Sequence, residues 1–266
     1  MNKNIECFGK VNLGLDVYKS YPKKSNYHKI ETIMIVYREF SDIMTISETF
    51  EDFSVTYEDT HGNVIDIEND SITKAYEYFQ NYFKLKQNYT VKVVKSIPMG
   101  SGFGGAASNA ASFMNYVAEE NDFELTKEGT MFKDSDYHKI VFEVGSDVPF
   151  FLSGDDIAHV SGFGEIIEKI PSYNVPTFSV IGSNVTTSSS EIYGEFDDLA
   201  LKVKSSNYKK IISKLPLVQV KYVQNNLQNP AFSKHVGIKN LYDSLDQNEK
   251  DRTFLNASGG YFVRFE

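Results

Sequence analysis

An α+β fold is predicted by this sequence, because segments with strand and helix patterns alternate irregularly along it, without a regular strand-helix repeat. Its 266 residues are 41% hydrophobic and 24% charged, a composition typical of a globular protein that buries a sizeable core. No internal repeat and no low-complexity segment interrupts the chain. We therefore expect one large domain or two modest ones.

In the N-terminal half, extended segments come first and helical patterns follow. Runs rich in β-branched and aromatic residues predict strands. These strands are residues 5–18, read as an extended pair, and residues 30–37, 43–47, 53–57 and 89–96. Apolar residues at helical spacing predict helices at residues 70–83, 108–118 and 137–143.

The C-terminal half continues the mixture of strands and helices. Strands are predicted at residues 157–160, 165–170, 178–182 and 261–265, and helices at residues 208–214 and 237–245. The apolar run at residues 178–182 is expected to be buried. A turn-rich stretch, Ser153-Gly154-Asp155-Asp156, is the candidate boundary between a domain of residues 1–154 and a domain of residues 155–266.

Composition argues against several classes of protein. The net charge of −9 disfavours nucleic-acid binding, which needs a concentrated basic surface. No apolar run approaches the roughly 20 residues that span a bilayer, and the polar start lacks a signal-peptide pattern, so we expect no membrane segment and a cytoplasmic location. Cys7 is the only cysteine, which excludes an internal disulfide, and its apolar surroundings predict a core position. The acidic surface identifies no protein partner.

The most informative segment is a glycine-rich stretch between a predicted strand and a predicted helix. It carries Gly100, Gly102, Gly104 and Gly105. Glycine permits positive φ and close approach of a ligand to the backbone, and a helix N-terminus favours an anion. The stretch therefore predicts a loop that cradles phosphate, although it matches neither the Walker nor the dinucleotide-binding fingerprint. A tight turn of small packing residues is the alternative.

Two further segments place polar side chains in apolar surroundings. Asp147 precedes an apolar Val-Pro-Phe-Phe run, where a partly desolvated carboxylate could accept or orient a hydroxyl proton. A helix-capping or turn aspartate is the alternative. Lys10 and Asn12 share one face of a predicted strand, because side chains alternate with a period of two. They could bind a phosphate together, or form the solvent face of an edge strand.

Taken together and in this order, these segments resemble the GHMP kinase superfamily over nearly the full chain. The motifs are Lys10-Val11-Asn12-Leu13-Gly14-Leu15, Asn26-Tyr27-His28, the glycine-rich loop, Gly145-Ser146-Asp147-Val148-Pro149-Phe150-Phe151 and the small-residue run Asn256-Ala257-Ser258-Gly259-Gly260. The Asn109 that follows Ser108 and the Asp-Val-Pro-Phe run are most similar to the members that phosphorylate a methylerythritol linked to cytidine diphosphate.

The resemblance implies two α+β halves with an active site in the cleft between them. The N-terminal domain would bind ATP, and the C-terminal domain would have a ferredoxin-like arrangement. Members of this kind transfer the γ-phosphate of ATP to the 2-hydroxyl of the small-molecule substrate, with Mg²⁺ bridging the phosphates. We therefore expect ATP and Mg²⁺ as cofactors, and we assign no protein ligand to the metal.

The resemblance also assigns roles by position. Asp147 would be the catalytic acid that takes or orients the hydroxyl proton, and Lys10 would offset transition-state charge. The ATP-binding residues would be Lys95, Pro98, Gly100, Gly102, Gly104, Gly105, Ser108 and Asn109. The acceptor would be bound by Asn12 at its polyol and by Tyr27, His28 and Tyr193 around the cytosine.

Four positions depart from the family pattern. Ala106 and Ala107 stand where a glycine and a serine are usual in the loop, and Ala257 replaces a glycine near the C-terminus. Asp70 takes the place of an asparagine expected near the adenine, and an ionised carboxylate cannot donate hydrogen bonds. Two alternatives follow: a kinase for another small alcohol, and a homologue that binds nucleotide or a partner without catalysis.

Overall fold

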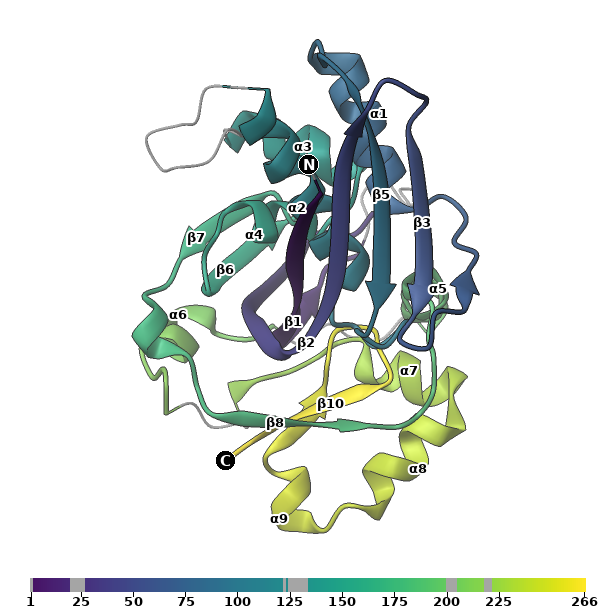
Figure 1. Cartoon of the computed structure of the whole chain (residues 1–266). Coiled ribbons are helices and arrows are strands. Elements are labelled where there is room, and N and C mark those ends of the chain that lie inside the picture. The colour runs from purple at the N-terminus through teal and green to yellow at the C-terminus, as the bar shows by residue number, and fades with distance from the viewer. Residues whose placement is uncertain (1, 20–26, 122, 124–133, 200–204, 218–221) are drawn as a thin grey trace.

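A large sheet accounts for most of the N-terminal half of the chain in the computed structural model, which describes residues 2–19, 27–121, 123, 134–199, 205–217 and 222–266. Asn26 of the sequence motif lies outside these ranges. Within them, the sheet has seven strands, and β1 (Lys3–Val17) pairs beside the main path (Figure 1). The path is β4 (Val64–Ile65), β3 (Ser54–Asp59), β5 (Asn88–Lys95), β2 (Ile30–Thr49), β6 (Ile157–Gly162) and β7 (Ile166–Lys169).

The two longest strands, β1 and β2, run antiparallel along the middle of the molecule. β2 pairs with β5 along its second half and with β6 along its first half. The sequence predicts one break within residues 5–18 and another between residues 37 and 43. The structure has a continuous strand at each place, β1 at the first and β2 at the second. A register irregularity between Phe8 and Gly9 absorbs the extra residues of β2 around Arg38.

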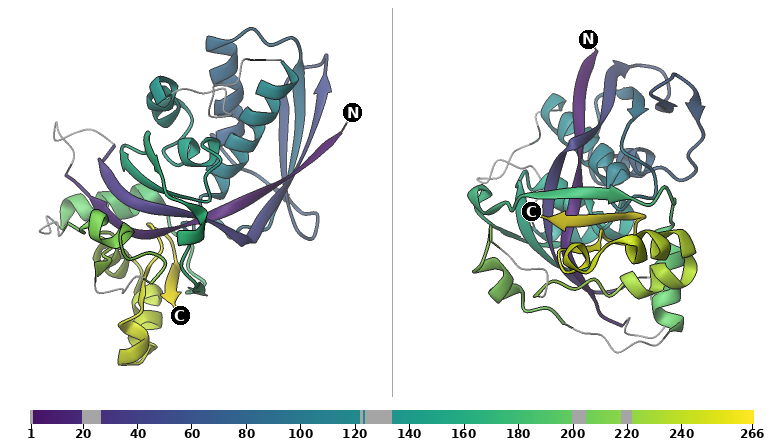
Figure 2. Two further views of the ribbon diagram at one scale, coloured as in Figure 1. Left: turned by 90° about the vertical axis from the view of Figure 1, so that its left-hand side faces the viewer. Right: turned by 90° about the horizontal axis from the view of Figure 1, so that it is seen from below.

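Helices cover one face of this sheet, as the left view of Figure 2 shows. They are α1 (Ser71–Tyr82), α2 (Gly105–Glu120), α3 (Asp134–Glu143) and α4 (Val148–Leu152). The apolar faces of these helices pack on Met44, Val91 and Val93 of the sheet. Cys7 lies in this core as predicted, and burial raises the pKa of its thiol to about 11. The other face of the sheet carries polar side chains that form hydrogen bonds between neighbouring strands, such as Ser41 with Glu6.

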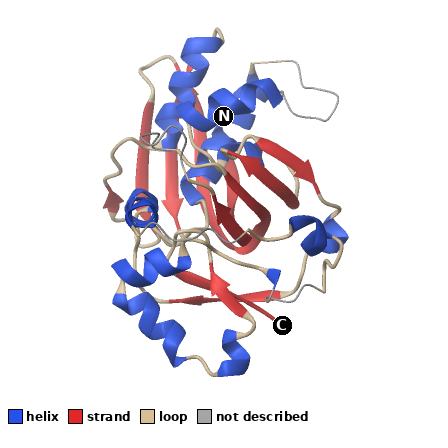
Figure 3. Cartoon of the chain, turned by 180° about the vertical axis from the view of Figure 1, so that it is seen from behind, coloured by secondary structure: helices blue, strands red, loops and turns tan. Residues whose placement is uncertain are grey.

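The C-terminal half forms a smaller sheet, which crosses the lower end of the large sheet in Figure 1. Its strand order is β8 (Phe178–Gly182), β10 (Tyr261–Phe265) and β9 (Thr253–Leu255). The surrounding helices are η1 (Ser172–Asn174), α5 (Ser189–Asp198), α6 (Tyr208–Ile212), α7 (Gln228–Lys234), α8 (Val236–Ser244) and α9 (Gln247–Lys250). Figure 3 shows α7 beside the small sheet and α8 and α9 below it. The prediction that residues 178–182 are buried is wrong, because every residue of β8 is half-buried.

One apolar cluster joins the two sheets. Val11 and Ile33 of the large sheet contribute to it, and so do Phe254 and Val263 of the small sheet. β6 and β7 follow residue 154 in the chain but pair into the large sheet. The boundary at residues 154/155 remains a prediction. Among the described residues, no helix has both the length and the apolar character needed to cross a membrane.

Candidate active site

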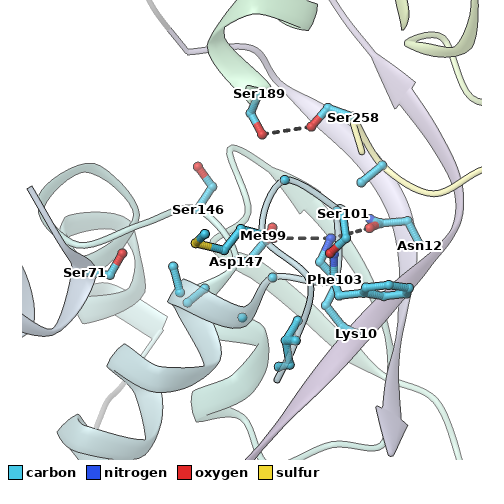
Figure 4. A pocket seen from close by; sticks show the side chains of 18 of the residues that line it. Lys10, Asn12, Ser71, Met99, Ser101, Phe103, Ser146, Asp147, Ser189 and Ser258 are labelled. Atoms are coloured by element: carbon cyan, nitrogen blue, oxygen red, sulfur yellow. Dashed lines mark hydrogen bonds and ion pairs between the residues drawn. The ribbon is translucent and has the colours of Figure 1, made fainter. Parts of the chain in front are cut away.

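A cavity of about 950 Å³ lies where the two halves meet. β1 contributes Lys10 and Asn12 to its wall, and the loop between β5 and α2 forms another side (Figure 4). Ser146 and Asp147 reach it from the segment before α4, and Ser258 from the turn before β10. Its volume is at the upper end of the usual range for small-molecule sites, so a nucleotide together with a second ligand is a reasonable occupant.

The glycine-rich loop has the conformation that its sequence predicts. Gly100, Gly102 and Gly104 have φ values of 66°, 81° and 69°, which disfavour any residue with a Cβ. Gly104 occupies the N-cap of α2 and offers no side-chain acceptor to the first turn. The free N–H groups at a helix start and the positive end of its dipole form a site for an anion.

Gly100 lies against the backbone of the C-terminal half. A Cβ there would lie 2.6 Å from the carbonyl oxygen of Thr187 and 2.7 Å from its nitrogen. We predict that Gly100→Ala lowers the unfolding free energy by about 2–4 kcal/mol, combining left-handed strain with overpacking. The control is Gly62→Ala: Gly62 has a φ of 84° and no atom within 4 Å of an added Cβ. Gly62→Ala should lower the unfolding free energy by only about 1–2 kcal/mol. Equal losses of unfolding free energy in the two variants, measured by urea unfolding, would contradict the prediction.

Lys10 and Asp147 form an ion pair at the wall of the cavity. The Lys10 Nζ lies 3.3 Å from the Asp147 Oδ2 and 2.5 Å from the Asn12 Oδ1. The Lys10 side chain is 3% exposed and the Asp147 side chain 28%, so the carboxylate remains open to a ligand. Asp147 stands at the N-cap of α4 but makes no capping hydrogen bond. The solvent-facing alternative for Lys10 is therefore wrong, whereas Asp147 does lie in a turn before α4, without a capping hydrogen bond.

Lys95, the last residue of β5, lines the cavity beside the start of α2. Its ammonium pairs with the fully buried Asp42 and donates to the Asn109 Oδ1 at 3.0 Å. Asp42 also accepts from the backbone N–H groups of Ser96 and Ile97, at 2.8 and 2.9 Å. The end of β5 is thus fixed by one buried carboxylate just before the loop begins.

Another part of the cavity is lined by the aromatic rings of Tyr27, His28 and Tyr193. The rings of His28 and Tyr193 are 5.1 Å apart, and His28 Nε2 lies 3.0 Å from an Asp197 carboxylate oxygen. His28 Nδ1 is buried without a hydrogen-bond partner in the described part of the chain. Burial raises the pKa of the Tyr193 hydroxyl, so this group remains a neutral hydroxyl.

Comparison with known proteins decides the family. A model described as "GHMP kinases N terminal domain" matches residues 70–155. The 4-diphosphocytidyl-2-C-methyl-D-erythritol kinase of Ureaplasma parvum is 30% identical over 264 residues, which cover 98% of this chain and 95% of that protein. The chain belongs to the 4-diphosphocytidyl-2-C-methyl-D-erythritol kinase family. The enzyme of that name from a Sulfurihydrogenibium species is 29% identical over 241 residues, covering 89% of this chain and 82% of that protein.

Solved structures confirm the fold expected for this kinase family. A crystal structure of 4-(cytidine 5'-diphospho)-2C-methyl-D-erythritol kinase superposes with a TM-score of 0.68 at 19% identity, covering 99% of this chain and 90% of that one. A mevalonate pyrophosphate decarboxylase from Streptococcus pyogenes gives 0.64 at 10% identity, over 100% of this chain and 90% of that one. The predicted α+β fold and the resemblance to GHMP kinases are both confirmed. The chain is therefore a small-molecule kinase of the GHMP superfamily.

Most of the site residues predicted from the sequence line this cavity. Those on its wall are Lys10, Asn12, Tyr27, His28, Lys95, Pro98, Gly100, Gly102, Gly104, Gly105, Asp147 and Tyr193. Ser108 and Asn109 instead lie buried in α2 and are not among the lining residues. Asp70 also lies off the wall: it caps α1, and its carboxylate accepts hydrogen bonds from Tyr57 and Thr73.

Several residues that line the cavity were not predicted from the sequence. They are Asp66, Ile67, Glu68 and Ser71 before and at the start of α1, Phe163 after β6, and Ser189 and Ser190 at the start of α5. Their segments carry no motif, and only the fold brings them to the cavity. Asp42 was also missed, because it lies in the polar stretch between two predicted strands, where a surface aspartate is the usual expectation.

The altered C-terminal motif places an alanine in a left-handed backbone conformation that favours glycine. Ala257 has a φ of 50°, which costs an alanine about 1–2 kcal/mol. We predict that Ala257→Gly raises the unfolding free energy by about 0.5–1 kcal/mol, since the entropy lost by glycine offsets part of the relief. Thermal unfolding measures this. Ala118→Gly inside α2 is the opposite control and should destabilise by about 1 kcal/mol; destabilisation by both changes would contradict the assignment of strain.

The donor groups of the cavity fit a Mg²⁺ ion that is held mainly by a nucleotide. Within the described ranges, no three His, Cys, Asp or Glu residues gather in a way that could hold a metal ion. Asp66, Glu68 and Asp147 are the carboxylates that line the cavity. Protein-bound Mg²⁺ commonly takes one or two carboxylates, water and substrate phosphates as ligands. This donor set suits such a shared ion and offers no separate metal cage.

Proposed function

We propose that this chain transfers the γ-phosphoryl group of ATP to the 2-hydroxyl of 4-diphosphocytidyl-2-C-methyl-D-erythritol. The observation that carries the proposal is the Lys10–Asp147 pair, 3.3 Å apart at the wall of a cavity that also contains the glycine-rich loop. The names of the relatives supply the substrate. The cytoplasmic location stays a prediction from the sequence.

In the proposed reaction, the acceptor hydroxyl attacks the γ-phosphorus of ATP. A new oxygen–phosphorus bond forms, the bond from the γ-phosphorus to the bridging β,γ-oxygen breaks, and ADP leaves with the electron pair. Asp147 accepts the proton of the hydroxyl, as aspartates do in other phosphoryl transfers. Its partial exposure, 28% of the side chain, leaves room for that contact.

Positive charge around the reacting phosphate is the second part of the proposal. Lys10 lies between the loop and Asp147: a Cβ built on Gly104 would approach its Cε to 3.0 Å. Its ammonium and the N-terminus of α2 would stabilise the charge that spreads over the phosphoryl oxygens. Mg²⁺ bound with ATP would neutralise phosphate charge, and Asp147 is one of the cavity carboxylates that could hold it.

We assign the cytidine to the aromatic part of the cavity. Tyr27 and Tyr193 would stack on the base, and stacking on an aromatic side chain contributes about 1–3 kcal/mol per base. Tyr27 is held by an edge-to-face contact with Phe142, with ring centroids 4.7 Å apart. His28 Nδ1, which has no partner among the described residues, is available for a hydrogen bond, and Asn12 would face the polyol.

The test is ADP release with ATP, Mg²⁺ and a panel of acceptors. We expect turnover with 4-diphosphocytidyl-2-C-methyl-D-erythritol and none with mevalonate, homoserine or galactose. Turnover with one of the other alcohols would support the alternative kinase. Silence from the folded protein with every acceptor would indicate a homologue without catalysis.

A further inference from the structure

A buried chain of hydrogen bonds runs from Thr32 on β2 to Lys10 on β1. The Thr32 hydroxyl donates to the Gly14 carbonyl oxygen at 2.5 Å and accepts from the Asn12 Nδ2 at 3.1 Å. The Asn12 Oδ1 then accepts from the Lys10 Nζ at 2.5 Å. Thr32 is 0% exposed, and Lys10 and Asn12 are each 2% exposed, so these buried polar groups depend on one another for hydrogen bonds.

The donors and acceptors in this series of hydrogen bonds permit a single orientation of the Asn12 side-chain amide. An ammonium has only donors, so Lys10 requires the carbonyl end of that amide. The single hydroxyl hydrogen of Thr32 is used by Gly14, which leaves the hydroxyl oxygen as an acceptor for the amide nitrogen. The backbone N–H of Asn12 is also held, by the Asn256 Oδ1 at 3.0 Å. The amide therefore cannot rotate without losing Thr32, Lys10 or both.

We propose that Thr32 is a positioning residue for phosphoryl transfer: through the Asn12 amide, its hydroxyl holds the Lys10 ammonium beside Asp147. Thr32 does not line the cavity, so its influence passes through Asn12. This inference rests on the proposed roles of Lys10 and Asp147. Without the hydroxyl, the Asn12 Nδ2 is a buried donor without an acceptor, so the side-chain amide is no longer fixed at that end and turns away from the ammonium toward another acceptor. Lys10 then loses its acceptor.

Thr32→Val removes the hydroxyl and nearly preserves the shape of the side chain. We expect kcat to fall about ten- to hundredfold, because small displacements of reacting groups reduce rates to this extent. KM for ATP should change less than about threefold, because Thr32 does not line the cavity and Asn12, which it holds, is assigned to the acceptor. Thr32→Ser, which keeps the hydroxyl, should restore kcat to within about threefold of the wild type.

The chain offers a matched control in Thr253, which is also a buried strand threonine. Thr253 is 3% exposed, lies in β9 away from the cavity lining and has no hydrogen-bond partner for its hydroxyl in the described ranges. Thr253→Val should leave kcat unchanged. Thermal unfolding of all variants verifies that they are folded. Equal kcat for folded Thr32→Val and wild type, or equal losses in Thr32→Val and Thr32→Ser, would overturn the proposal.

A crystal structure of Thr32→Val separates this inference from the proposed function, because it needs no turnover. We expect the Asn12 amide to rotate and the Lys10 Nζ to lie beyond the 4.0 Å ion-pair limit from Asp147, against 3.3 Å in the wild type. An unchanged amide and an unchanged pair would overturn the role of Thr32. If the wild type has no activity while the pair moves as expected, the proposed function fails and the positioning role remains.

Discussion

Replacing Asp147 by asparagine will lower kcat by about 10²–10⁴-fold, the usual contribution of a general acid or base. The amide keeps the size of the side chain but cannot take the proton of the acceptor hydroxyl. Acceptor affinity, measured by calorimetry, should change less than about threefold, since the carboxylate acts in the transition state. Steady-state ADP release measures kcat.

The control for this variant is Asp156→Asn. Asp156 also carries a paired carboxylate, 2.6 Å from Arg38, but does not line the cavity. Its kcat should equal that of the wild type. Wild-type turnover in Asp147→Asn would remove Asp147 from the mechanism.

Replacing Lys10 by methionine has the second largest expected effect. The change retains the length of the apolar stem and removes the ammonium that faces Asp147. We expect kcat to fall about 10²–10³-fold, comparable to the loss of one preorganised charge-stabilising donor. The variant should also lose about 1–3 kcal/mol of unfolding free energy, because the Asn12 Oδ1 is left buried without its donor.

Lys92→Met is the matched lysine control. Lys92 pairs with Glu58 at 2.8 Å on the polar face of the sheet, and its side chain is 49% exposed. We expect wild-type kcat and nearly wild-type stability, because exposed pairs contribute little. Equal kcat values for Lys10→Met and Lys92→Met would contradict a role for the Lys10 charge in phosphoryl transfer.

Local patterns predicted the elements whose residues have strong and uninterrupted signals. Residues 178–182 and 261–265 match β8 and β10 in full, because both are short runs of β-forming residues between turns. The burial of β8 could not be predicted, since it depends on which faces other segments cover. The break predicted within β2 reflects the charged Arg38-Glu39, whereas pairing with β1 keeps the backbone extended through them.

The C-terminal helices show where such patterns are insufficient. α5 begins in a run of serines and α7 contains Pro230, so neither has a clear helical signal in sequence. Both are stabilised by packing on the small sheet, where Ile192 of α5 and Ala231 of α7 are buried with Phe262. Tertiary contacts outweigh weak intrinsic propensity at these positions.

For the candidate site, strand alternation correctly placed Lys10 and Asn12 on one face. Pairing of Lys10 with Asp147 could not be read from spacing, because it joins β1 to a segment far along the chain. The resemblance to GHMP kinases brought these residues together before the structure did. It could not indicate Asp42 or Thr32, whose roles depend on hydrogen bonds inside this particular core.

The most direct test of the central claim is the mass and ³¹P spectrum of the acceptor after incubation with ATP, Mg²⁺ and the wild-type chain. We predict that 4-diphosphocytidyl-2-C-methyl-D-erythritol gains one phosphoryl group, at its 2-hydroxyl, and that Asp147→Asn produces almost none. An unmodified acceptor with folded wild-type protein, or a phosphoryl group at another position, would contradict the account.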